Sequence, residues 1–274
     1  MEGRILPLLL AGCLLLAGCL LASPAAARDG WTALFNGRDL SNFDIAYSSK
    51  PVDGRPAAAM FAVKDGMVHT YPGQAAGTAQ PSAYFQTRNA YKDYVLHIEY
   101  RWGDRKFAPR MNRLKDAGLV FHIYEDAPQS WPHGIECQIE DKDVADLWLI
   151  SSRADVTVKD AVQRPDPDPL QDGQPAYAPD GQKRTFGDHE KYVRVRHAAN
   201  LEHPGWNSVD VVVRGDSAVY LVNGKPDMRV TAMRKWTGNG WAPLTEGKIL
   251  FQAEFAEVWY RNIKIRPVRE SDPR

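Results

Sequence analysis

The sequence predicts an all-β fold, a sandwich of two antiparallel sheets. Many short segments alternate apolar and polar residues, as in residues 94–101 (YVLHIEYR). Successive side chains of a strand point to opposite faces, so a period of two indicates strands with one buried face. Turn-forming pairs such as Asp65-Gly66 and Asn223-Gly224 separate these segments. No helical stripe longer than a few turns competes with this interpretation.

The strands can be placed along the chain from the same pattern. We expect them, in chain order, within residues 94–101, 118–124, 134–140, 208–214, 219–222 and 248–255. Apolar residues of one parity should fill the space between the sheets. The predicted core residues are Phe121, Ile135, Cys137, Ile139, Val211, Val213 and Phe251. Residues 28–274 contain no internal repeat and no linker, which predicts a single domain, and the Pro- and Gly-rich stretch 160–191 predicts a long loop at its rim.

The first 27 residues have the pattern of a secretory signal. Arg4 precedes an apolar run over residues 5–22, and small residues follow at 23–27. Two processing routes stay open. Cleavage after residue 27 would release a soluble protein, whereas the lipobox-like segment 16–19 (LAGC) would leave a lipidated Cys19. Both routes predict export to the periplasm or the cell envelope, with membrane contact only through a lipid on Cys19.

Charge and cysteine content exclude several classes of function. The chain has 34 basic and 34 acidic residues, so it offers no general electrostatic attraction to nucleic acid. Beyond the leader, Cys137 is the only cysteine, which excludes an internal disulfide and a cysteine-based structural zinc site. Cys137 has the apolar parity of its segment, so we expect a buried small side chain there rather than a nucleophile.

Residues 134–140 (GIECQIE) carry the strongest functional signal. In a strand, Glu136, Gln138 and Glu140 share the face opposite the core. Two carboxyl groups and an amide on one face suit a polar cleft for a hydroxyl-rich ligand, and carboxyl groups can also move protons. A half-solvated strand would show the same pattern, but several other segments carry a similar polar face.

The order of several motifs resembles the 3-keto-disaccharide hydrolase domain, a bacterial family long catalogued only as a domain of unknown function. The matching segments are 30–40 (GWTALFNGRDL), 61–68 (FAVKDGMV), 91–102 (YKDYVLHIEYRW), 117–122 (AGLVFH), 131–140 (WPHGIECQIE), 146–148 (DLW), 205–210 (GWNSVD), 222–225 (VNGK), 247–252 (GKILFQ) and 260–265 (YRNIKI). Two features differ from the family pattern. Asp116-Ala117-Gly118 stands in place of Asn-Ser-Gly, and Gly205 is followed directly by Trp206 without the usual glutamate.

The resemblance implies a concanavalin A-like jelly roll of two antiparallel sheets with a sugar-binding concave face. It also implies an enzyme that acts on 3-keto-glycosides, which a separate oxidoreductase produces. A ketone at C3 acidifies the hydrogen on C2, so a base can remove that proton and the enolate can expel the C1 oxygen substituent. Addition of water to the resulting enone completes a net hydrolysis.

This chemistry requires a base, a proton donor for the leaving oxygen and groups that hold the sugar. Glu136 is the candidate base or metal ligand, and His122, on the outward parity of its segment, is the candidate acid or ligand. The candidate substrate-binding residues are Gln138, Glu140, Trp148, Gln252 and Glu254. Glu136 and Asp146 are the candidate ligands of a divalent cation such as calcium, which prefers oxygen donors.

Two other classes of function remain open. Glu136 and Glu140 could serve a two-carboxylate glycoside hydrolase, although retaining chemistry needs carboxyl groups about 5–5.5 Å apart. Residues four apart in a strand have Cα atoms roughly 13 Å apart, and the central position is Gln138 rather than an acid. A non-catalytic carbohydrate-binding module is the third class, because aromatic side chains are plentiful. Convergent carboxyl groups would favour an enzyme over a binding module.

Overall fold

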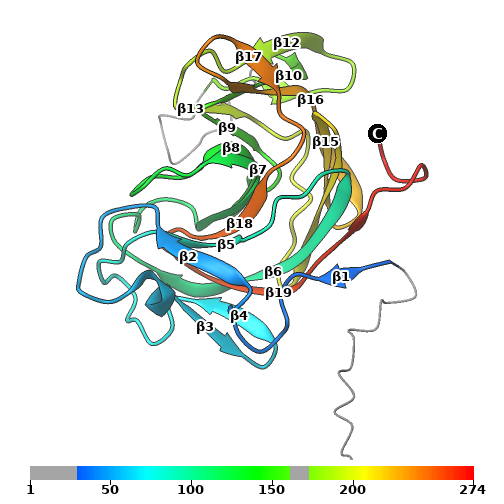
Figure 1. Cartoon of the computed structure of the whole chain (residues 1–274). Helices are drawn as coiled ribbons and strands as arrows, with labels where there is room; N and C mark the ends of the chain where they lie inside the picture. The colour runs from blue at the N-terminus through cyan, green and yellow to red at the C-terminus, as the bar shows by residue number, and fades with distance from the viewer. Residues whose placement is uncertain (1–29, 161–172) are drawn as a thin grey trace, which may run out of the picture.

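The computed structural model describes residues 30–160 and 173–274 (Figure 1). The predicted signal, the lipobox and Cys19 lie outside the described residues. Within the described ranges, no helix has the length and hydropathy needed to cross a membrane. The only helical element described there is the short 3₁₀ turn η1 (Ala57–Met60).

Two sheets form the sandwich, and every ladder between named strands is antiparallel. The larger sheet contains, along its main path, β11 (Ala176–Tyr177), β10 (Ser152–Lys159), β16 (Lys225–Trp236), β15 (Ser217–Val222), β14 (Asn207–Arg214), β6 (Tyr94–Lys106), β19 (Ala256–Pro267), β4 (Met67–Thr70) and β3 (Phe61–Lys64). Three strands join it at the side, namely β1 (Thr32–Ala33) on β19, β12 (Gln182–Phe186) on β10 and β17 (Trp241–Pro243) on β16.

The smaller sheet carries the residues of the predicted site. Its strand order is β13 (Tyr192–Val195), β9 (Leu147–Ile150), β8 (His133–Glu140), β7 (Asp116–Glu125), β18 (Lys248–Ala253), β5 (Ala83–Thr87) and β2 (Phe43–Tyr47). One of its faces packs against the larger sheet, and we call the opposite one the outer face. Figure 1 shows the two layers, with the hairpins of β10–β12 and β16–β17 projecting beyond one end of the sandwich.

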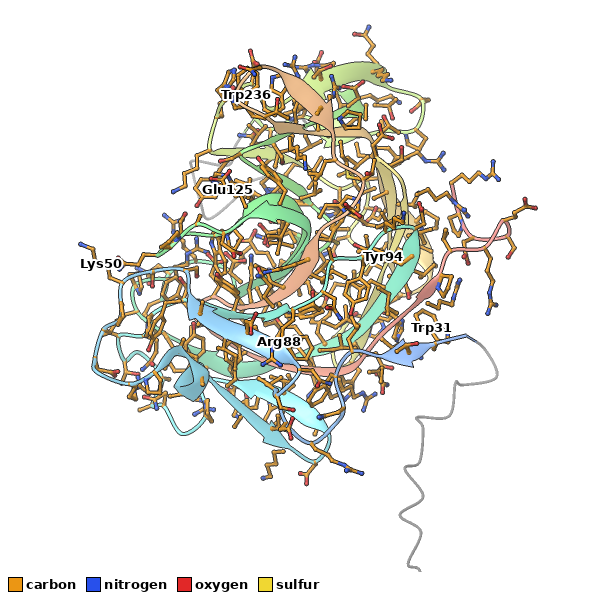
Figure 2. All side chains as sticks on the ribbon, viewed as in Figure 1. Trp31, Lys50, Arg88, Tyr94, Glu125 and Trp236 are labelled. Carbon is orange, nitrogen blue, oxygen red and sulfur yellow. The ribbon has the colours of Figure 1, made fainter. Side chains whose placement is uncertain are left out.

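One continuous apolar core fills the space between the sheets, and Figure 2 shows how densely side chains occupy it. All seven predicted core residues belong to this core and are fully buried: Phe121, Ile135, Cys137, Ile139, Val211, Val213 and Phe251. The two-sheet antiparallel prediction is therefore confirmed. The turn prediction is confirmed at Asn223-Gly224, where positive φ angles of 51° and 77° close the β15–β16 hairpin.

A β-bulge in β7 reverses the alternation predicted for this strand. His122 has a positive φ of 51°, and the β7–β8 register shifts between Phe121 and Glu125. After the bulge, Ile123 joins Val120 in an apolar cluster outside the main core. The bulge also explains the glycine at 247, because a Cβ there would lie 2.4 Å from the carbonyl carbon of His122.

The stretch 160–191 differs in part from the predicted loop. Residues 161–172 lie outside the described ranges, but β11 and β12 form within the rest of the stretch and pair with β10. Sequence patterning missed both strands because β11 has only two residues and β12 is almost entirely exposed. An exposed strand shows no alternation of apolar and polar residues.

Candidate functional site

Acidic and amide side chains converge on the outer face of the smaller sheet. Asp116 pairs with Glu140 on β8 and bridges to Glu254 beyond the end of β18, which aligns three carboxyl groups across neighbouring strands. Gly118 pairs with Gln138 and Val120 with Glu136 in the next two rows. We call Asp116, Glu136, Gln138, Glu140, Gln252 and Glu254 the outer-face cluster; all six side chains are buried.

Glu136 reaches across β7 toward β18. Its Oε1 accepts a hydrogen bond of 2.7 Å from Nε2 of Gln252. This contact is possible because Gly118 lies beneath it without a side chain. A Cβ at position 118 would lie 2.2 Å from Oε1 of Glu136 and 2.8 Å from Oε1 of Gln252. The glycine therefore provides the space that the Glu136 carboxyl group occupies.

Gly118→Ala is expected to lower the free energy of unfolding by about 1–3 kcal/mol, because the methyl group overpacks the site and displaces Glu136 and Gln252. Gly54→Ala is the matched control, since nothing lies within 4 Å of a Cβ at that position. Urea-induced unfolding of the two variants measures the difference. Equal stabilities would show that Glu136 does not rest above Gly118.

Two arginines partly neutralise the cluster from opposite sides. Arg110 donates to Asp116 and forms an ion pair of 3.0 Å with Glu254. Arg194 on β13 donates to Glu140 over 2.9 Å, and its guanidinium carbon lies 5.4 Å from the ring centre of Trp148. Sequence reasoning missed both arginines. Arg194 alternates with Val193 and Val195, a pattern that could have predicted a strand with Arg194 on its polar face. Arg110 lies outside the strands, where no such pattern exists.

Burial and mutual repulsion raise the pKa values of the carboxyl groups. For Glu136, burial is the main cause of a pKa well above its ordinary value, and the charges of Glu254 and Asp116 add to it. Burial and Glu254 raise the pKa of Asp116 to about 7. Burial and Asp116 raise the pKa of Glu140 to about 8. At neutral pH the cluster therefore holds protons that it can exchange.

Asp116→Asn is expected to stabilise the protein at alkaline pH relative to the wild type. A carboxyl group whose pKa rises on folding stabilises the fold below its ordinary pKa of 3.8, and this contribution is lost as the pH rises through about 7. The difference between a pKa of about 7, which already includes the opposing charge of Arg110, and the ordinary 3.8 sets an upper limit of about 4 kcal/mol.

The pH dependence of urea unfolding between pH 4 and pH 8 measures this effect. The advantage of the Asn variant should grow with pH. If the two proteins lose stability in parallel across this range, Asp116 does not titrate as described. The variant keeps an acceptor oxygen for Arg110, so loss of that hydrogen bond does not obscure the comparison.

Several buried polar atoms around the cluster lack a hydrogen-bond partner. Among the described residues these are Oδ1 of Asp116, Oε1 of Gln138, Oε1 of Gln252, Nε1 of Trp148 and Nη1 of Arg194. An unsatisfied buried polar atom costs about 1–3 kcal/mol, so native proteins contain few of them. The set mixes donors and acceptors on one face, which matches the hydroxyl groups of a polyhydroxylated ligand.

The structure brings most of the predicted site residues together. Glu136, Gln138, Glu140, Gln252 and Glu254 belong to the outer-face cluster. Trp148 pairs with Glu136 on the neighbouring strand, on the same face. Asp116 also belongs to the cluster but was not among the predicted site residues, although it has the same parity as Gly118 two positions later.

The expected position of His122 on this face is wrong. The bulge turns its ring inward, where Nε2 contacts the carbonyl oxygen of Gly215 over 3.1 Å and the ring packs edge-on against Tyr94. Burial lowers the pKa of His122 to about 4, so the ring is neutral at physiological pH. An inward neutral histidine has no route to a ligand on the outer face.

Asp146 also departs from the prediction of a metal site shared with Glu136. Its carboxylate binds Nε of Arg194 over 2.6 Å and Nδ1 of His197 over 2.5 Å. Among the described residues, Asp143, Asp146 and His197 form a group with ligand atoms within 4.8 Å of one another, and Glu136 is not part of it. Arginine and histidine nitrogens already hydrogen-bond these carboxylate oxygens, and the nearby arginine charges repel a metal ion, so this group does not suit a cation.

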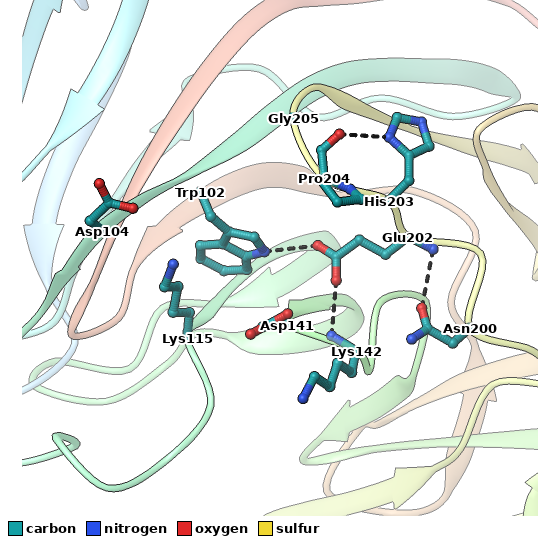
Figure 3. A pocket seen from close by; sticks show the side chains of 10 residues that line it. All are labelled: Trp102, Asp104, Lys115, Asp141, Lys142, Asn200, Glu202, His203, Pro204 and Gly205. Atoms are coloured by element: carbon teal, nitrogen blue, oxygen red, sulfur yellow. Dashed lines mark hydrogen bonds between the residues drawn. The ribbon is translucent and has the colours of Figure 1, made fainter.

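A separate cavity of about 410 Å³ lies at the rim of the sandwich (Figure 3). None of the predicted site residues lines it. Glu202 closes one side, where Oε1 accepts from Nε1 of Trp102 over 2.8 Å and Oε2 accepts from the backbone of Lys142 over 2.9 Å. Lys115 and Asp141 also line the cavity and directly adjoin Asp116 and Glu140 in the sequence.

With the geometry established, comparisons with known proteins identify the family. A family model described as the 3-keto-alpha-glucoside-1,2-lyase-like domain matches residues 30–266. The chain belongs to this family. The resemblance inferred from the motifs is therefore confirmed over nearly the whole described chain. Among proteins with curated functions, none matches the sequence significantly.

Several solved structures are similar to this family member. A provisionally assigned glycosyl hydrolase from Parabacteroides distasonis is similar with a TM-score of 0.50 and 18% identity, covering 88% of this chain and 95% of that one. A second such structure from the same organism has a TM-score of 0.49 and 17% identity, covering 87% and 99%. A Bacillus licheniformis β-glucanase has a TM-score of 0.42 and 11% identity, covering 88% and 97%. At 18% identity the likeness to the first of these structures concerns the fold alone.

Proposed function

We propose that this protein cleaves glycosides whose sugar is oxidised to a ketone at C3, by elimination followed by hydration. Family membership supports a carbohydrate-related activity. The observation that carries the proposal is the outer-face cluster, where carboxyl groups with raised pKa values lie among unpartnered donors and acceptors. Such a site can hold sugar hydroxyls and exchange protons near neutral pH.

Each proton of the proposed reaction has a group to hold it. Asp116, with a pKa of about 7 and a free Oδ1, takes the proton from C2. The electron pair moves to the C3 oxygen, which becomes an enolate, and the C1–O bond breaks. Glu136, whose pKa burial raises well above its ordinary value, gives its proton to the departing oxygen. Water then adds across C1 and C2 of the enone, with hydroxyl on C1 and hydrogen on C2.

This assignment changes the role predicted for Glu136. The sequence suggested a base, but a carboxyl group whose pKa lies far above its ordinary value suits a proton donor better. The free Nη1 of Arg194 can donate to the enolate oxygen, which develops negative charge in the transition state. Oε1 of Gln138 and Oε1 of Gln252 can accept from sugar hydroxyls. A divalent cation such as calcium at Glu136 stays a prediction and carries no step here.

The two-carboxylate alternative receives less support from the geometry. Glu136 is held by Gln252 on the β18 side of its strand, whereas Glu140 is held by Arg194 on the β13 side. The two carboxyl groups are therefore drawn in opposite directions. Retaining chemistry requires them about 5–5.5 Å apart around one glycosidic bond.

Incubation with 3-keto-glucosides beside their unoxidised parents tests the proposed function. NMR of the sugars should show consumption of the ketone forms, transient enone and release of the C1 substituent, with the parents unchanged. Comparable cleavage of the parents would favour the two-carboxylate reaction, which needs no ketone. Binding of both forms without turnover of either would mean a carbohydrate-binding module.

A further inference from the structure

A small aromatic cavity lies away from the outer-face cluster. It measures about 160 Å³, and its lining includes Tyr124, His133, Ser151, His189, Trp236 and Trp241. We call it the aromatic cavity. It lies at the Glu125 and His133 ends of β7 and β8, opposite the Asp116 and Glu140 ends that carry the row of carboxyl groups. Figure 2 labels Trp236 and Glu125, which line the cavity from different sheets.

Three aromatic rings pack against one another in the lining of this cavity. The ring centres of Trp236 and Trp241 are 5.5 Å apart, with 64° between their planes. His189 lies 4.7 Å from Trp236 and 5.5 Å from Trp241. At these separations the three rings contact one another, so no ligand ring fits between them, and only their outward faces are left to stack on a single ligand ring. The exposed face of Trp236 can stack on the C–H face of such a ligand.

Exposed aromatic side chains concentrate at this edge of the protein. Trp236 is 40% exposed and Tyr192 is 41% exposed, and they are the two aromatic members of the exposed large hydrophobic residues within the described ranges. Tyr192 pairs with Ile150, the neighbour of the lining residue Ser151. Exposing a tryptophan costs hydrophobic free energy, so a gathering of exposed aromatics indicates a binding surface.

Polar groups border the same cavity. Nδ1 of His133 lies 3.3 Å from a carboxylate oxygen of Glu125. Both line the cavity together with Ser151 and Tyr124. A site with aromatic faces in the middle and hydrogen-bonding groups at the border matches a sugar ring, which has apolar C–H faces and hydroxyl groups around its edge.

We infer that the aromatic cavity binds one hexopyranose unit, at a site separate from the outer-face cluster. The volume admits one such ring and little more. Recognition by stacking and by the border groups requires no ketone at C3, so unoxidised sugars bind there. The two sites share no residue, and the inference therefore stands whether or not the proposed reaction is correct.

The indole N–H signals of the eight tryptophans provide a test in the intact protein. The probes are methyl β-D-glucopyranoside and cellobiose, titrated in a ¹H–¹⁵N NMR experiment after assignment by Trp→Phe substitution. The signals of Trp236 and Trp241 should shift together with a single Kd. The signal of Trp206 should stay unchanged, because this residue does not line the cavity and its ring packs against Arg261 and Arg101.

Variants of Trp236 separate binding from folding. Trp236→Ala should raise the Kd for the sugar, measured at the Trp241 signal, by about tenfold or more. Trp236→Tyr should retain most of the affinity because an aromatic face remains. Both variants should keep the turnover of any 3-keto-glucoside that the wild type consumes. Glu136→Gln should leave the sugar response of Trp236 unchanged.

Three results would overturn the inference. The first is the absence of any shift at Trp236 and Trp241 with both sugars. The second is an unchanged Kd at Trp241 in the Trp236→Ala protein. The third is a shift that follows protein concentration instead of sugar concentration, since this would make the cavity a contact between copies of the chain.

Discussion

Glu136→Gln should lower turnover of a 3-keto-glucoside by about 10²–10⁴-fold, the usual contribution of one positioned proton-transfer group. The Glu136 carboxyl group is fully surrounded and its pKa is raised well above the ordinary value, mainly by burial. Glutamine has nearly the shape of the protonated acid, so Gln252 can still pack against it. Turnover should therefore fall while the free energy of unfolding is preserved or increased.

Glu246→Gln is the matched control, because Glu246 is an exposed carboxylate close to β18 in the sequence. Rates should be measured with the ketone substrate at saturation, so that weaker binding is not mistaken for slower chemistry. Near-normal turnover by Glu136→Gln would remove Glu136 from the reaction. A rise in KM alone would assign it to sugar binding.

Arg194→Met should lower the free energy of unfolding by about 3–5 kcal/mol, the usual cost of removing one partner of a buried ion pair. The Arg194 side chain is 1% exposed and lies 2.9 Å from Glu140, 3.3 Å from Asp143 and 2.5 Å from Asp146. Methionine fills a similar volume but leaves these carboxylates without their shared cation. Urea unfolding at neutral pH measures the loss.

Arg261→Met is the control for this substitution. Its side chain is 38% exposed and pairs with Glu99 over 2.6 Å, and exposed ion pairs contribute only about 0–1 kcal/mol. A loss at Arg194 no larger than at Arg261 would mean that the three carboxylates find other partners. Lower pH should narrow the difference for Arg194→Met, because protonation discharges the carboxylates left behind.

The alternation of side chains was enough to predict the core and the polar face of β8. Ile135, Cys137 and Ile139 point inward because strand geometry leaves no other arrangement for a regular segment. The same rule places Glu136 and Gln138 on the outer face. In a regular strand, the sequence therefore predicts with little ambiguity which side chains share a face.

The rule fails where the backbone is irregular or where partners come from distant segments. By simple alternation, the sequence position of His122 predicts an outward side chain. The bulge adds one residue to the strand and turns the side chain inward, and no residue type marks a bulge reliably. Arg110 contacts Asp116 from a segment outside the strands, so the alternation of residues does not predict this contact. The pKa values of the cluster depend on such neighbours, which is why acid and base roles could not be separated from sequence.

Because of the bulge at His122, the structure of β7 depends more on the number of residues in the strand than on their identities. Deleting His122 would remove the extra residue and return the strand to simple alternation, while Ile123 would keep its outward position in the cluster with Val120 and Leu250. The backbone that now approaches Gly247 would also withdraw, and a side chain at that position would become acceptable. Single-residue insertions and deletions in β7 should therefore be coupled to substitutions at 247, a pattern that point substitutions in either strand would not reveal.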